Sequence, residues 1–379
     1  MTAAQPHVGL NLVFLVPGET GGMEVAAREL IPALLEQAPP GMRFTVFVNR
    51  EAAASLDGSW EGVPTVTVPV HARNRLQWVL GEQTFLPRLA ARAGVDLVHS
   101  LASTAPLWGA FRRVVTVHDL IYARFPEAHS GLREKGMRVL VPAAVRRSHR
   151  IIADSQSTRE DLIGLVGVDS ERIDVVPLGL GTVRRDPPLS EEETRHRFSL
   201  GERRVLLTLS AKRPHKNLAA LIGAVAKIPS ERRPVLVLPG YPTPYEAELR
   251  RLAVDADVAA DVRFLGWVSG AEIEGLWTVA DAFVFPSLYE GFGLPVLEAM
   301  ARGVPVACSS ASSLPEVAGD AALLFDPHDD EAIARALVRL LDDRELRERL
   351  VDLGSARVRE FTWERSAKLT LASYARSLA

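Results

Sequence analysis

Short apolar runs of strand length alternate with helix-length segments along almost the whole chain. The alternation starts near Gly9 and restarts near Val205, after the proline- and glycine-rich segment PLGLGTVRRDPPLS. Strands separated by helices normally lie parallel in one sheet, with helices on both faces. A length of 379 residues also suits two domains better than one core. The pattern therefore predicts an α/β protein with two doubly wound parallel sheets.

The domain boundaries follow from this alternation and its interruption. We expect residues 1–180 to form the first domain, 181–200 a linker, 201–360 the second domain, and 361–379 a C-terminal helix. The strands are expected at 9–16, 44–48, 65–68, 97–100, 113–117, 151–153 and 173–176, then at 205–209, 235–238, 262–265, 282–285, 304–307 and 322–325.

Composition excludes several classes of protein. A net charge of -3 argues against a dedicated nucleic-acid binder. The single cysteine, Cys308, excludes an internal disulfide and a cysteine-based zinc site. No apolar run reaches the length of a membrane span, and the run 8–16 lacks a basic leader, so we expect a cytoplasmic protein. No HExxH, clustered His/Cys or DxD-type metal motif stands out, and no metal site is predicted.

The run PSLYEGFGLPVLEAM, residues 286–300, carries the strongest chemical signal. Two carboxylates, Glu290 and Glu298, flank a glycine-framed loop that leads from a short strand into a helix. The backbone N–H groups of Phe292, Gly293 and Leu294 would lie at the positive end of the helix dipole, which favours an anionic group such as a diphosphate. An ordinary acidic helix start is the alternative interpretation.

Three other positions have residues suited to the same chemistry. Gly21 and Gly22 form a backbone-exposing turn between the first strand and a helix, although many such turns carry a glycine pair. Lys216, in SAKRPHKNL, could neutralise a diphosphate without a metal, unless it belongs to a solvated basic turn. His118 ends a strand at the carboxyl edge, where α/β sheets bind ligands, but it could instead be a packed, hydrogen-bonded residue.

The spacing of the two glutamates, the EGFGLP loop and the following EA resemble the E-x7-E signature of retaining glycosyltransferases. The resembled fold is GT-B, in which two Rossmann-like domains face a central cleft, and the resembled family is GT4. The resemblance implies that Glu298 holds the ribose of a nucleotide and that Glu290 and His118 contact the transferred sugar as catalytic residues. It also implies that the last helix crosses back to the first domain.

The resemblance assigns further donor contacts. Gly21 and Gly22 would approach the donor diphosphate, Lys216 would bind it, and the main chain at Val268 would meet the nucleobase. The family often has an arginine five positions before the lysine, but this chain has Ala211 there. Arg213 is our preferred second cation.

The implied reaction moves a hexose from a nucleoside diphosphate sugar to an acceptor hydroxyl, with retention and without a metal or other cofactor. A mannosyl or rhamnosyl donor is slightly favoured, and the acceptor would be a glycan, a lipid-linked intermediate or a secondary metabolite. A nucleotide-sugar epimerase and a non-catalytic sugar-nucleotide-binding protein are the alternatives. A dehydrogenase is disfavoured because no G-x-G-x-x-G follows the first strand.

One basic segment raises the question of a second binding partner. Six basic residues over a predicted helix could meet a phosphorylated acceptor or associate weakly with an anionic membrane surface, although a solvated helix face is the simpler interpretation. They are Arg133, Lys135, Arg138, Arg146, Arg147 and Arg150.

Overall fold

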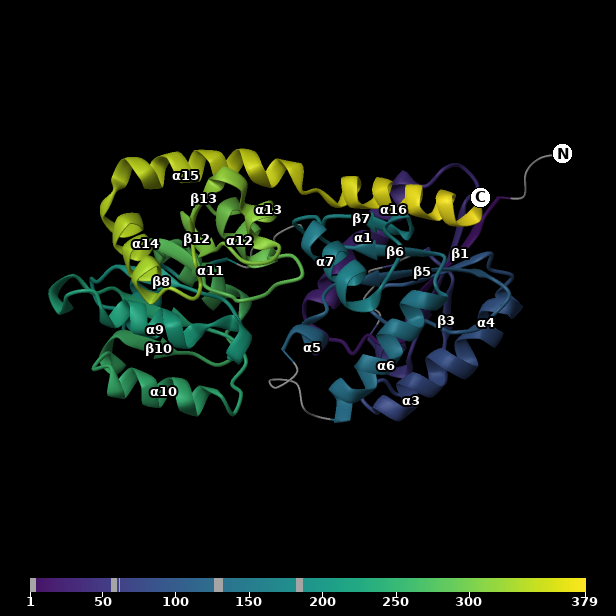
Figure 1. Cartoon of the computed structure of the whole chain (residues 1–379), viewed down its shortest axis with the longest axis horizontal. Helices are drawn as coiled ribbons and strands as arrows, with labels where there is room; N and C mark the ends of the chain where they lie inside the picture. Colours follow the sequence, from purple (N-terminus) through teal and green to yellow (C-terminus); the bar gives the residue numbers. More distant parts are fainter. Residues whose placement is uncertain (1–4, 56–59, 61, 126–131, 182–186) are drawn as a thin grey trace. The chain divides into compact units, whose positions relative to one another are not determined.

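The computed structural model describes residues 5–55, 60, 62–125, 132–181 and 187–379. The chain divides into two compact units. Unit 1 comprises Met1–Gly181 and Phe361–Ala379, and unit 2 comprises Thr182–Glu360. Each unit has its own parallel sheet (Figure 1).

Unit 1 contains a seven-stranded sheet in the order β3-β2-β1-β4-β5-β6-β7, and every pair of neighbours is parallel. The strands are β1 (His7–Leu12), β2 (Arg43–Val48), β3 (Thr65–Thr67), β4 (Leu97–Ser100), β5 (Arg112–Val117), β6 (Arg150–Ala153) and β7 (Ile173–Val175). The α-helices are α1 (Gly22–Gln37), α2 (Arg50–Ala54), α3 (Arg75–Leu80), α4 (Leu86–Ala93), α5 (Ile121–Arg124), α6 (Leu132–Arg147), α7 (Gln156–Asp161) and α16 (Trp363–Leu378).

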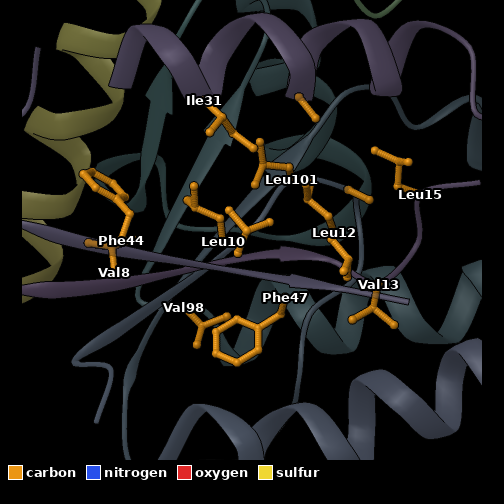
Figure 2. Packing of buried hydrophobic residues seen from close by; sticks show 14 of the residues in the cluster. Val8, Leu10, Leu12, Val13, Leu15, Ile31, Phe44, Phe47, Val98 and Leu101 are labelled. Carbon is orange, nitrogen blue, oxygen red and sulfur yellow. The ribbon is translucent and has the colours of Figure 1, made fainter. Parts of the chain in front are cut away.

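The core of unit 1 packs on both faces of this sheet because its central strands are buried throughout. Figure 2 shows Leu10 and Ile31 on one side of the strands, and Phe47 and Val98 on the other. Gly9 makes room for the ring of Phe47, since a Cβ at Gly9 would lie only 2.8 Å from a carbon of that ring. A side chain at this position would therefore force the ring of Phe47, or the strand that carries it, to shift.

Helix α16 (yellow in Figure 1) packs against α1, β5 and β6 of unit 1, although it ends the chain. Its Tyr374 is fully buried, and the Tyr374 hydroxyl lies 2.7 Å from Nδ1 of His99 in β4. Ser366 donates a hydrogen bond to the carbonyl of Pro177. Polar as well as apolar contacts therefore attach the last helix to the first sheet.

Unit 2 contains a six-stranded parallel sheet in the order β10-β9-β8-β11-β12-β13. Its strands are β8 (Val205–Leu207), β9 (Val235–Leu238), β10 (Val262–Phe264), β11 (Ala282–Phe285), β12 (Val306–Ser309) and β13 (Ala322–Phe325). Its helices are α8 (Glu191–Arg197), α9 (Leu218–Ala226), α10 (Glu246–Asp255), α11 (Gly270–Val279), α12 (Leu294–Ala301), α13 (Leu314–Ala318), α14 (Asp330–Asp342) and α15 (Arg344–Arg357).

All the predicted strands are present, with several ends shifted; β12, expected at 304–307, spans Val306–Ser309. Strand β1 ends at Leu12, and not at Val16, because the side-chain oxygen of Asn11 accepts a hydrogen bond from the Val13 amide and turns the chain. Asn217 stands directly before α9, where asparagine often caps a helix with its side chain, but it makes no such bond. It adopts a left-handed conformation with φ 56°, and its side-chain amide donates to the carbonyl of Pro327.

Part of the segment 181–200, which we expected to be a linker, is helical. Residues 182–186 lie outside the described residues, whereas Glu191–Arg197 form α8 within unit 2. Ser190 and Glu193 form a capping box that starts this helix. Cys308 is buried in β12, and burial raises the pKa of its thiol to about 12. Within the described ranges, no helix has the length and apolar character needed to cross a bilayer.

Candidate active site

The point where the sheet order reverses in unit 2 lies between β8 and β11, which are neighbours in space but distant in sequence. Ligands of open α/β sheets bind at the carboxyl ends of the strands at such a point, because the loops there diverge and leave a crevice. The two loops concerned follow Leu207 and Phe285. They contain Lys216 and Glu290, which the sequence singled out.

Lys216 and Glu290 form the central contact of this edge. The ammonium Nζ of Lys216 donates a hydrogen bond to Oε1 of Glu290 at 2.6 Å, and both side chains are largely but not fully buried. Lys216 also lies over the ring of Phe285, with its Nζ 5.7 Å from the ring centroid. The Leu288 amide donates to the His215 carbonyl at 2.8 Å, which ties the two loops together. A cation and a carboxylate are thus held side by side at the switch point.

Two serines that the sequence analysis missed fix the Glu290 loop. Ser312 accepts a hydrogen bond from the Glu290 amide at 2.8 Å and donates to the Glu290 carbonyl at 2.9 Å. Ser313 donates to the carbonyls of Glu290 and Phe292. Ser312 has a φ of 50°, an uncommon value for a residue with a side chain. No sequence signal pointed to these serines, because they follow the next strand.

The glycine-framed loop then enters α12 as the sequence predicted. Gly293 has a φ of 119°, and a Cβ there would lie 2.7 Å from a carbon of Leu314. Leu294 begins the helix and Pro295 follows in its first turn, where an amide hydrogen is not needed. The amides of Phe292, Gly293 and Leu294 therefore stand at the positive end of α12, beside the Lys216–Glu290 pair.

Glu298 lies one turn into α12 and differs from Glu290 in its surroundings. Burial raises the pKa of Glu298; the charge of Arg302 opposes this shift and that of Glu274 adds to it. Arg302 is itself held by Glu274 at 2.5 Å and stacks over Trp277. No side-chain partner of Glu298 is found within the described part of the chain, so its carboxylate can accept hydrogen bonds from a ligand.

Lys212, next to the candidate second cation Arg213, has a structural role. Lys212 is fully buried, and its Nζ donates to the carbonyls of Gly240 at 2.7 Å and Leu265 at 2.6 Å. Burial lowers its pKa. It therefore braces the loops after β9 and β10. Arg213 is exposed, and within the described ranges its guanidinium makes no ion pair, so its role as a second cation stays a prediction.

Val268 lies in the short loop between β10 and α11, directly before Ser269, which caps α11. Trp267 beside it is 73% exposed, and its ring packs against that of Tyr241 at a tilt of 38°, with centroids 5.0 Å apart. The loop is thus at the carboxyl edge of the sheet, where the prediction for Val268 requires it. A backbone contact with a base stays a prediction.

In unit 1 the glycine pair stands at the start of α1. Gly21 has a φ of 65° and precedes the helix, and Gly22 is its first residue. A Cβ added at either position would meet no atom within 4 Å, so open space adjoins the backbone there. Glu24 accepts a hydrogen bond from the Gly18 amide and pairs with Arg28, which shapes the preceding turn. This backbone is accessible to a ligand.

His118, at the end of β5, is more constrained than the sequence indicated. Its Nδ1 donates to Oδ2 of Asp154 at 2.6 Å, and its Nε2 donates to the carbonyl of Leu101 at 2.9 Å. Because both partners are acceptors, both ring nitrogens must carry protons, and the ring is an imidazolium. Burial alone would lower the pKa of His118, but the charge and hydrogen bond of Asp154 outweigh it and raise that pKa to about 9.

The basic segment is only partly accessible. Arg133 and Lys135 lie outside the residues whose side chains are described, and Arg150 is engaged by Asp174, with Nε 3.0 Å from Oδ2. Weak membrane association therefore stays a prediction. Over the described ranges, no group of three His, Cys, Asp or Glu residues is arranged to hold a metal ion.

Known proteins match this chain over both units. A family model described as Glycosyl transferases group 1 matches residues 190–356, and one described as Glycosyltransferase Family 4 matches residues 20–184. The O-antigen chain mannosyltransferase B of Escherichia coli is 33% identical over 271 residues, covering 69% of this chain and 70% of that protein. The chain belongs to glycosyltransferase family 4. The predicted family and enzyme class are thereby confirmed.

Other relatives of this GT4 glycosyltransferase are longer. The serotype-specific mannosyltransferase WbdA of Escherichia coli is 32% identical over 278 residues, which cover 71% of this chain but only 34% of WbdA. The chain thus spans about a third of the length of that relative.

Solved structures confirm the predicted GT-B fold. The sucrose-phosphate synthase of Thermosynechococcus elongatus superposes with a TM-score of 0.75 at 22% identity, covering 98% of each chain. HepE from Anabaena, solved with UDP-glucose, gives a TM-score of 0.75 at 20% identity and covers 97% of this chain and 99% of HepE.

Proposed function

We propose that this GT4 glycosyltransferase moves a mannosyl residue from a nucleoside diphosphate mannose to a hydroxyl of a bacterial glycan, retaining the anomeric configuration. Support for the sugar comes from the mannosyltransferases among its relatives. Support for a nucleotide sugar comes from the carboxyl edge of unit 2 and from HepE, which binds UDP-glucose in the same fold.

The observation that carries the proposal is the Lys216–Glu290 pair beside the first turn of α12. As the glycosidic bond breaks, negative charge grows on the leaving diphosphate. Lys216 and the amides of Phe292, Gly293 and Leu294 stabilise that charge where it develops, so no metal ion is needed. Arg213 is the candidate for a second cation.

Two carboxylates divide the remaining donor contacts. Glu290 is oriented by Lys216 and by its serine-bound backbone, and it accepts hydrogen bonds from the sugar hydroxyls. Glu298 has no competing side-chain partner among the described residues, and it accepts hydrogen bonds from the ribose hydroxyls. The main chain at Val268 meets the base.

Unit 1 supplies the imidazolium of His118 and the open backbone at Gly21 and Gly22. His118 contacts the transferred sugar in this proposal. To donate from Nε2 to a sugar hydroxyl, the ring must exchange its bond to the Leu101 carbonyl for the new one, while Asp154 keeps the proton on Nδ1. The glycine pair approaches the diphosphate.

The proposal is tested by thermal-shift and calorimetric titration with UDP, GDP and dTDP, followed by their mannose, glucose and rhamnose derivatives. We expect one nucleotide to bind clearly and its mannose derivative to support transfer to a mannose-containing acceptor without added metal. Transfer of another hexose only would contradict the proposed mannose donor. Loss of activity in EDTA would contradict the proposal that the reaction needs no metal ion. Epimerised donor formed without acceptor would identify the epimerase alternative, which no observation favours.

A further inference from the structure

Glu82 carries a buried carboxyl group in the segment of unit 1 that joins α3 to α4. It is 2% exposed and lies in the π-helix η1 (Gly81–Phe85), which continues the one helix into the other. Both Gly81 and Glu82, two successive residues of this π-helix, are buried. Gly81 fits there closely, since a Cβ at this position would lie 2.6 Å from a carbon of Val70. Single π-turns inside helices are frequent at functional sites.

Two side chains from neighbouring strand ends donate to one oxygen of Glu82. Its Oε1 accepts from Nδ2 of Asn11 at 2.9 Å and from Oγ1 of Thr104 at 3.1 Å. Asn11 lies near the end of β1, and Thr104 lies in the loop after β4, the strand that pairs with β1. The order of the unit 1 sheet reverses between these two strands. Glu82 therefore joins two chain segments at the point where open α/β sheets bind ligands.

The carboxyl group of Glu82 is held without a cation. Over the described part of the chain it makes no ion pair, and its hydrogen-bond donors are neutral side chains. Burial raises the pKa of Glu82 to about 7, although the hydrogen bonds of Thr104, Asn11 and Gln83 oppose that rise. Burying a charge without a partner of opposite charge lowers stability. The contribution of Glu82 therefore lies in what its contacts hold in place.

The partners of Glu82 lead to the ring of His118. The loop that carries Thr104 begins at Leu101, and the Leu101 carbonyl accepts the hydrogen bond of His118 Nε2 at 2.9 Å. The Leu101 amide donates to the main-chain carbonyl of Asn11. Both residues that donate to Glu82 thus lie next to the segment that holds Leu101, one at its start in β1 and one three residues further along the loop.

Gln83, the next residue of η1, binds the same loop. Its Nε2 donates to the Ala105 carbonyl at 3.0 Å, and its Oε1 accepts from the Leu107 amide at 3.0 Å. Two successive side chains of one π-helix therefore set the position of the loop 101–107.

We propose that Glu82 is a positioning residue for His118, because by holding Thr104 and Asn11 it fixes the Leu101 carbonyl to which the ring is bonded. In the proposed function, His118 exchanges this carbonyl for a sugar hydroxyl, so the place of Leu101 sets where the ring starts. The meaning for catalysis rests on that proposed function. The positioning itself does not, and its test needs neither donor nor acceptor.

The test follows the ring signals of His118 by NMR during a pH titration, assigned by their absence in His118→Gln. Burial lowers the pKa of His118, whereas Asp154, the Leu101 carbonyl and Asp119 raise it. In Thr104→Val the side chain keeps its shape but cannot donate to Glu82, so the Leu101 carbonyl is held less firmly. The pKa of His118 should therefore fall by about half a unit, a threefold change in proton affinity.

His99 does not confuse this titration. Burial, followed by the charge of His118, lowers the pKa of His99 to about 3, so His99 stays neutral over the range in which His118 titrates.

Two variants of Glu82 separate its charge from its geometry. Glu82→Gln keeps an oxygen that can accept from Asn11 and Thr104, so the pKa of His118 should stay close to the wild-type value. Glu82→Leu removes that oxygen and should lower the pKa of His118 as Thr104→Val does.

Thr84→Val is the matched control. Thr84 is on the same π-helix, but its hydroxyl donates to the Leu80 carbonyl and not to the loop. Its replacement should leave the pKa of His118 unchanged. An unchanged or raised pKa of His118 in Thr104→Val, or an equal fall in Thr84→Val or Glu82→Gln, would refute the positioning role.

Transfer assays add the catalytic readout. With the nucleoside diphosphate mannose that wild type uses, Thr104→Val should lower kcat, while the nucleotide affinity, which unit 2 provides, stays the same. An unchanged kcat would refute a catalytic meaning of this positioning. If wild type transfers no mannose, the proposed function fails, and the pKa of His118 still decides whether Glu82 positions the ring.

Discussion

Each unit has one acid–base pair at the carboxyl edge of its own sheet. The two pairs differ in how many of their hydrogen-bonding groups already have partners. In unit 2, Lys216 has one carboxylate partner and keeps two further N–H groups, and its side chain is 18% exposed. In unit 1, both nitrogens of His118 are bonded and Asp154 is 2% exposed. Under the proposed function, the first pair receives an anion, and the second maintains a fixed charge.

The comparison shows that the degree of burial distinguishes a charged group that can bind a ligand from one that is held in place. A largely buried lysine that solvent still reaches exchanges partners at less cost than a fully buried charge. A buried imidazolium cannot lose its carboxylate without leaving an uncompensated charge. Substitutions in the unit 1 pair should therefore lower stability as well as transfer, whereas substitutions in the unit 2 pair should lower transfer and leave stability nearly intact.

The largest effect on stability is expected for Asp154→Asn. Breaking a buried ion pair by removing one partner costs about 3 to 5 kcal/mol, so the free energy of unfolding of this variant should fall by about that amount in urea denaturation. Asp119→Asn is the control, because Asp119 adjoins His118 in sequence and its Oδ1 accepts from the Ile121 amide. Equal losses of unfolding free energy in the two variants would show that the His118–Asp154 pair contributes no more to stability than Asp119 does.

Lys216→Ala should reduce transfer and leave stability nearly intact. Removing one group that stabilises a developing anion lowers kcat by about 100- to 1000-fold, which corresponds to about 2.7 to 4 kcal/mol. The control is Lys227→Ala, which breaks a surface pair of the same length with Glu331, 2.6 Å between Nζ and Oε1. Full transfer activity of Lys216→Ala with the best donor would remove this lysine from the mechanism.

The pair in unit 1 also predicts a pH window for stability. The pKa of His118 is about 9 in the folded chain, compared with 6.5 for an ordinary histidine. Its contribution is fully present below about pH 6.5 and is lost as the pH rises toward 9, to a total of about 3 kcal/mol. Urea unfolding of wild type and His118→Gln should show the difference between them shrinking across this window; a constant difference would mean that the pKa of His118 is the same in the folded and unfolded chains.

A smaller effect is expected for Glu298→Ala. Loss of hydrogen bonds between the ribose and a charged acceptor should weaken nucleotide binding by about 1.5 to 3 kcal/mol in calorimetry. Glu274→Gln makes a useful comparison, because Glu274 lies close to Glu298 but is engaged with Arg302. If nucleotide affinity is unchanged in Glu298→Ala, the ribose lies elsewhere.

Sequence reasoning identified the elements and the residues whose signals are local. The strand–loop–helix run around Gly293 could be predicted because glycine, proline and two glutamates occur within 15 residues. Lys216 could be found because it stands in a basic loop after a predicted strand. The strands and loops follow from periodicity and the rule for parallel sheets, whereas the roles of Lys216 and the two glutamates rest also on the resemblance to GT4.

The supporting residues could not be predicted because their partners are distant in sequence. Asp154 follows His118 by 36 residues, and Ser312 follows Glu290 by 22. Lys212 was visible as a basic residue, yet its burial between the carbonyls of Gly240 and Leu265 depends on the packing of three strands. Asn217 is of a residue type that often caps helices, but the hydrogen bond from its side chain to the distant Pro327 carbonyl determines its conformation.

The most direct test of the central claim measures what Lys216 binds. Calorimetry would compare the nucleoside diphosphate that binds best with its monophosphate, in wild type and in Lys216→Ala. We predict that the diphosphate binds more tightly to wild type and that Lys216→Ala removes most of this difference while leaving the monophosphate nearly unaffected. An undiminished preference for the diphosphate in Lys216→Ala would contradict the assignment of this edge of unit 2 to the pyrophosphate of the donor.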